Sequence, residues 1–90
     1  MSREKLREAS DTLREAMELV DDEGVQERLY DQSDQLAWLA TRDQEPDHGR
    51  LAKHMNALHE LAGDLDGEAA ELVTAARESV SAFRETVEGV

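Results

Sequence analysis

Leucine and alanine recur every seven residues through the second half of the chain, and this spacing constrains the fold more than any other feature. The two rows lie four residues apart, one made of Leu51, Leu58, Leu65 and Leu72, the other of Met55, Ala62, Ala69, Ala76 and Phe83. Seven residues complete almost two turns of α-helix, so both rows lie on one face of a helix. Because the register is unbroken, we predict one long helix over residues 47–88.

Two glycines are the weak points of this long helix. Gly63 and Gly67 lie off the apolar rows, and each costs roughly 1 kcal/mol relative to alanine inside a helix. The segment between them is also compatible with a turn, with Asp66 as the cap of a separate fourth helix. We expect the unbroken register to prevail, and we keep the break near Gly63–Gly67 as the alternative.

The beginning of the chain predicts a shorter helix over residues 3–21, with Ser2 as its N-cap. Leu6, Leu13 and Val20 recur every seven residues along it. Three acidic residues follow, and they oppose the dipole at a helix C-terminus. Gly24 is then free to take the left-handed conformation that often ends a helix.

A second short helix is predicted over residues 25–42. Its apolar face is expected to contain Val25, Leu29, Gln32, Leu36 and Leu39. Pro46 disfavours helix at the residue before it, so residues 43–49 are predicted to be a loop. Asp47 is a suitable cap for the helix that follows.

These elements predict a single all-α domain over residues 1–90, an antiparallel bundle of three helices with coiled-coil-like packing, or of four if the last helix is broken. A helix over residues 47–88 would be about 60 Å long. It would present more apolar surface than two shorter helices cover. We therefore expect a homodimer.

The charge of the chain excludes several functions. It has 22 acidic and 10 basic residues, a net charge of −12, and the basic residues are scattered among acids. Contacts with phosphates need clustered lysine and arginine, so we expect no direct nucleic-acid binding. No apolar run exceeds five residues and the first residues lack the apolar stretch of a signal peptide, so a cytoplasmic protein without membrane contact is expected.

The kind of acidity indicates a salty solvent. The chain has 8 arginines, only 2 lysines, a single asparagine and no isoleucine, with acids spread over an ordered pattern. This composition is typical of salt-loving archaea, whose cytosol screens repulsion between like charges; at 1 M salt the Debye length is about 3 Å. An ordinary acidic bacterial protein is the alternative.

Three stretches carry a resemblance to known proteins, namely residues 46–51, 60–69 and 75–84. Together they make residues 46–85 similar to small acidic helical proteins of haloarchaea, which are grouped in families of unknown function. The resemblance implies an all-helical fold and a halophilic setting. It implies no activity and no site residues.

No pattern of catalytic residues is present. The chain has no cysteine, no Gly-x-Ser-x-Gly motif and no phosphate-binding glycine loop, and none of its carboxylates is predicted to be buried. We therefore predict no enzyme, no catalytic residue and no cofactor, and favour a non-catalytic protein–protein interaction module. Tyr30 and Trp38, eight residues apart on one helix, are the candidate partner-binding anchors. Packing against the C-terminal helix is the other interpretation of these two aromatics.

Histidines supply the alternative function, a small bundle that binds a ligand or metal. His48 and His59 are eleven residues apart, which is three helical turns, and acids lie nearby. Metal-binding bundles use histidine with glutamate three residues before it, and His59 lacks this partner. We therefore predict no metal site.

Overall fold

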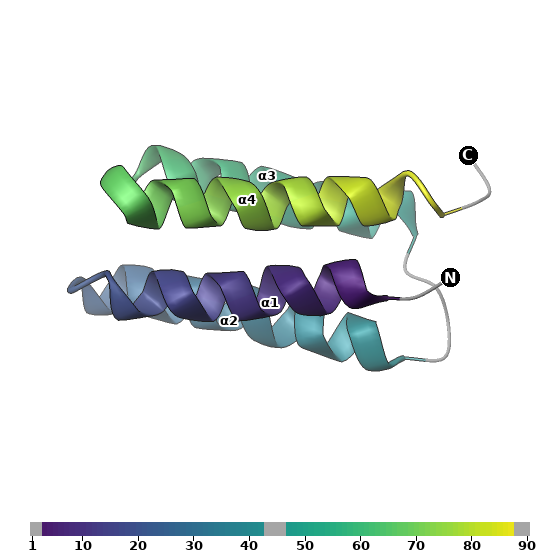
Figure 1. The fold of residues 1–90 in the computed structure, drawn as a ribbon, viewed down its shortest axis with the longest axis horizontal. Helices are drawn as coiled ribbons and strands as arrows, with labels where there is room; N and C mark the ends of the chain where they lie inside the picture. Colours follow the sequence, from purple (N-terminus) through teal and green to yellow (C-terminus); the bar gives the residue numbers. More distant parts are fainter. Residues whose placement is uncertain (1–2, 43–46, 88–90) are drawn as a thin grey trace.

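The computed structural model describes residues 3–42 and 47–87, which form four α-helices and no strand. The helices are α1 (Glu4–Glu18), α2 (Glu23–Thr41), α3 (His48–Gly63) and α4 (Gly67–Arg84). They run alternately in opposite directions, with α1 and α4 in front of α2 and α3 (Figure 1). The all-α fold is confirmed. Ser2, the loop residues 43–46 and residue 88, which ends the predicted long helix, lie outside the described residues.

The single long helix predicted over residues 47–88 is wrong. The chain leaves helix after Gly63 and begins α4 at Gly67, and the described structure measures 39 Å along its longest axis. The Asp64 N–H donates to the carbonyls of Glu60 and Leu61, which closes the last turn of α3. Gly67 then has a φ of +59°, a left-handed value that favours glycine. The break lies where the two-glycine alternative places it, and Asp66 is the N-cap residue of α4 but makes no side-chain capping hydrogen bond.

The turn changes which residues of the heptad rows are buried. Leu51 and Leu58 are fully buried on α3, whereas Leu65 and Leu72 are only half-buried. Residues 64–66 are not helical, so the buried face of α4 does not continue the buried face of α3 in the same register. The buried face of α4 therefore consists of Ala69, Val73, Ala76, Val80 and Phe83.

The first helix has the predicted apolar face. Leu6, Leu13 and Val20 are buried, and two fully buried alanines between them, Ala9 and Ala16, bring neighbouring backbones close. α1 ends at Glu18, three residues before the predicted end.

α2 begins two residues earlier than predicted, because Asp22 caps it. The Asp22 carboxylate accepts the N–H of Val25 at 3.1 Å, which satisfies a donor that the helix leaves free. Gly24 therefore lies inside α2, and the prediction of a left-handed cap at Gly24 is wrong. The cap predicted at Asp47 is confirmed, since its carboxylate accepts the Arg50 N–H at 2.6 Å.

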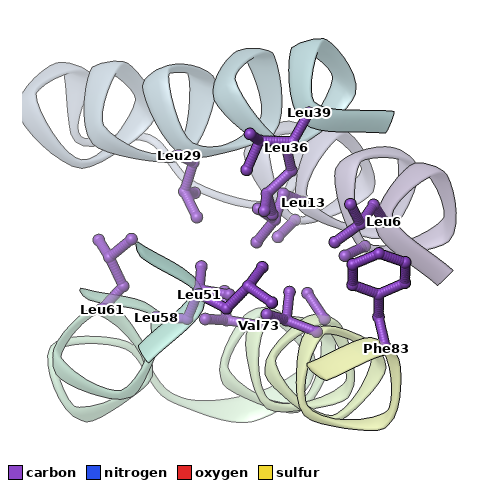
Figure 2. Packing of buried hydrophobic residues seen from close by; sticks show 14 of the residues in the cluster. Leu6, Leu13, Leu29, Leu36, Leu39, Leu51, Leu58, Leu61, Val73 and Phe83 are labelled. Atoms are coloured by element: carbon purple, nitrogen blue, oxygen red, sulfur yellow. The ribbon is translucent and has the colours of Figure 1, made fainter. Parts of the chain in front are cut away.

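One core joins all four helices (Figure 2). Leucines of α1 and α2 point toward those of α3 and toward Val73 and Phe83 of α4. The buried Ser10 hydroxyl of α1 donates to the Ser33 carbonyl of α2 at 2.7 Å, which joins these two helices. None of the helices in the described ranges is both long and apolar enough to cross a bilayer.

The two glycines beside the α3–α4 turn give a test of this fold. Neither would bring a new Cβ within 4 Å of another atom, so the backbone angle of Gly67 is the main difference between them. We expect Gly67→Ala to lower the free energy of unfolding by about 1 kcal/mol, because alanine is disfavoured at positive φ. Gly63→Ala should raise it by about 0.5 kcal/mol, through better helix propensity. Urea denaturation at fixed KCl measures both, and stabilisation by both substitutions would instead indicate one continuous helix.

Candidate functional site

Both predicted anchors lie on the surface of α2. Tyr30 and Trp38 are each 52% exposed, so neither side chain is buried against the C-terminal helices. The leucines of the same helix, Leu29, Leu36 and Leu39, are buried. We call the exposed side of α2 that carries Tyr30, Asp31, Asp34 and Trp38 the outer face.

Trp38 lies opposite the core and has a cationic neighbour. At 100° per residue, Trp38 is half a turn around α2 from Leu29. The Arg42 guanidinium lies 4.2 Å from the centre of the indole ring, a cation–π contact worth about 0.5–1 kcal/mol at an exposed site. The contact shows that this indole ring accepts a guanidinium.

Tyr30 lies at the edge of a groove between α1 and α2. Two adjoining hollows of about 790 and 440 Å³ meet here, and Met17, Gln26 and Tyr30 line both. Gln26 also donates to the Val20 carbonyl, which pairs an acceptor at the end of α1. Eight residues on an α-helix correspond to about 80° of rotation, so Tyr30 borders the groove while Trp38 points away from the core.

The two histidines of the alternative function are not brought together with acids. His48 lies at the start of α3, and its Nε2 is 2.9 Å from the Val87 carbonyl. His59 is exposed near the other end of the same helix. Within residues 3–42 and 47–87, no group of three or more histidine, aspartate or glutamate side chains is arranged to hold a metal ion.

A third histidine, to which the sequence pattern assigned no role, is buried by the fold. His54 is 7% exposed, and its Nδ1 lies 2.7 Å from the Gln32 Oε1 across the boundary between α2 and α3. Since the amide oxygen accepts, the Nδ1–H donates. Burial lowers the pKa of His54, and the positive charge of Arg50 lowers it further. Its spacing from Leu51 and Leu58, three and four residues, already places it on the buried face.

The chain is similar to one described protein family. The model of DUF7553, a family of unknown function, matches residues 1–86. The chain belongs to this family. Membership confirms the resemblance to a family of unknown function over a longer stretch than residues 46–85, while the haloarchaeal source stays a prediction. No curated protein and no solved structure matches the chain.

The buried histidine predicts a pH dependence of stability. The pKa of His54 is lower in the folded chain than its ordinary value of about 6.5, so the unfolded chain binds the proton more readily. The stability that depends on a neutral, buried His54 is therefore fully present above about pH 6.5, and it is lost as the pH falls through the pKa of His54 in the folded chain. We expect His54→Gln to lose less stability than the unsubstituted chain between pH 7.5 and 5, measured by urea denaturation.

His59→Gln is the matched control, because it removes an exposed histidine from the same helix. It should lose as much stability as the unsubstituted chain over this pH range. Equal behaviour of the two histidine variants would contradict the role of His54.

Proposed function

We propose that the protein is a non-catalytic protein–protein interaction module that binds its partner through the outer face of α2. The observation that carries this proposal is the exposure of Tyr30 and Trp38, two of the three aromatic side chains of the chain. Tryptophan and tyrosine are enriched among residues that dominate interface energies. Because about half of each of these large side chains is exposed, both can contact the surface of another protein.

The charges of the outer face indicate the chemistry of the partner. Asp31 and Asp34 are exposed between the aromatics, and Glu27 is exposed one turn before Tyr30. An apolar surface with arginine or lysine at its rim complements this arrangement, since its cations meet carboxylates and its apolar groups meet the rings. Within the chain, the Arg42 guanidinium already contacts the Trp38 ring in the way that a cation of the partner would.

A second copy of the chain is a weaker match to this face. The expectation of a homodimer rests on a single long helix, and α4, which folds back on α3, covers that apolar stripe within one chain. Two outer faces packed together would place like charges opposite one another, which disfavours a specific contact. Sedimentation equilibrium in about 2 M KCl tests self-association when charge repulsion is screened.

Affinity capture in about 2 M KCl tests the proposed interface, because the Debye length there is below about 3 Å and the acidic chain stays folded. We expect one protein to be captured reproducibly by the unsubstituted chain and lost with Tyr30→Ala plus Trp38→Ala. Chemical cross-linking should then place residues 30–38 beside an arginine- or lysine-bearing segment of that protein.

Leu19→Ala is the matched control for capture, because Leu19 is 49% exposed at the end of α1. It also removes a large apolar side chain from the surface and should leave the captured protein bound. Equal loss with Leu19→Ala, or full retention without both aromatics, would reject the outer face as the interface.

We also propose that the module works in a halophilic cytoplasm. A net charge of −12 on 90 residues repels itself, and compaction brings these charges closer. The ion pairs Lys5–Glu8 and Arg28–Asp64 are exposed, so they contribute little against this repulsion. Screening by dissolved salt is the larger stabilising effect.

The salt dependence of melting tests this proposal. Raising KCl from about 0.1 M to about 2 M should raise the melting temperature by about 10 °C or more, because the Debye length falls from about 10 Å to below about 3 Å. Circular dichroism at 222 nm follows the transition. Sucrose at equal osmolality is the control for solute exclusion, and an equal rise in sucrose or no rise in KCl would contradict the proposal.

A further inference from the structure

The boundary between α2 and α3 contains a hollow that the outer face does not use. These two helices make the fewest contacts of the four adjacent pairs in the bundle. Between them lies a cavity of about 500 Å³, which we call the α2–α3 groove; it is lined by Gln32, Gln35, Asp47, Gly49, Arg50, Lys53 and His54. The volume is within the range of sites for small organic molecules, about 300–1,000 Å³.

The charge of the groove is opposite to that of the whole chain. Arg50 and Lys53 both line it, and neither forms an ion pair within the described parts of the chain. Asp47 is the single acid in the lining, and its carboxylate is engaged by the Arg50 N–H at the start of α3. Arg50 and Lys53 are three residues apart on α3, so they lie on the same side of this helix and both border the hollow.

The remaining lining supplies hydrogen-bond donors. The Gln32 oxygen is occupied by His54, which leaves the Gln32 amide NH₂ as a donor. Gln35 is exposed three residues further along α2 and adds a second amide. Arginine, lysine and two amides offer more donors than the two oxygens of a carboxylate can accept, whereas a phosphate group presents three or more oxygens.

We propose that the α2–α3 groove binds a small organic phosphate, with Arg50 and Lys53 as its main anchors. Arg50 pairs with two phosphate oxygens, Lys53 neutralises the remaining charge, and the amides of Gln32 and Gln35 orient the group. The size of the groove leaves room for an organic portion beside the phosphate. This site is separate from the outer face of α2 and does not depend on the partner proposed there.

Titration with phenyl phosphate tests the site on the full chain. Amide resonances of residues 32–35 and 49–54 should shift in ¹H–¹⁵N spectra and saturate, at constant ionic strength and pH 7. Arg50→Gln plus Lys53→Gln should weaken binding at least about tenfold, because both cationic donors are lost. Both side chains are exposed, so the variant should keep the helical circular dichroism of the unsubstituted chain.

Lys5→Gln plus Arg7→Gln is the matched control, since it removes the same two charges from an exposed part of α1. It should bind phenyl phosphate within about twofold of the unsubstituted chain. Equal weakening by the two double variants, or shifts spread over the whole surface, would overturn the site. Benzoate binding as tightly as phenyl phosphate would overturn the assignment to phosphate.

Discussion

Burial of one apolar face on each of four helices holds the bundle together, and the turn at residues 64–66 allows this burial within a single chain. Without the turn, α4 would extend beyond α1 and α2 and leave Val73, Val80 and Phe83 in water. With it, α4 packs along both α1 and α3. Hydrophobic burial outweighs the cost of ending a helix, since each large aliphatic side chain contributes about 1.5–3 kcal/mol.

Polar groups at the helix ends make this packing specific. Asp22 and Asp47 cap α2 and α3, and the Arg3 guanidinium donates to the Leu39 and Arg42 carbonyls at the end of α2. The two hydrogen bonds of Arg3 join the start of α1 to the end of α2. Backbone groups left unpaired at helix ends cost free energy, so the caps help set where each helix begins and ends.

The same packing leaves two surfaces of different chemistry on α2. Its outer face is aromatic and acidic, whereas its side toward α3 borders a groove with Arg50 and Lys53. α2 packs closely on α1 and only loosely on α3. The proposed partner-binding face and the proposed phosphate groove therefore lie on separate sides of one helix.

Tyr30 and Trp38 illustrate how far the sequence predicts the site. The sequence leaves two interpretations of these aromatics open, packing against the C-terminal helix or contact with a partner, and the structure leaves both side chains 52% exposed. The burial of His54 could be predicted from the sequence, because its spacing from Leu51 places it on the buried face of α3. The hydrogen bond of His54 to Gln32 could not be predicted from the sequence, because the two residues are 22 positions apart and only helix packing brings them together.

The all-α class, the apolar face of the first helix, the three buried leucines of the second and the cap at Asp47 follow from the sequence alone, because these depend on contacts within a few residues. Val25 and Gln32, also predicted on the apolar face of the second helix, are only half-buried, and Ser33 is buried instead. The tertiary structure decided between one long helix and two. Heptad spacing is compatible with both, the two glycines weaken the long helix, and the burial available against α1 and α3 favours the turn before Gly67. That turn also buries, within one chain, the apolar stripe on which the expectation of a homodimer rests.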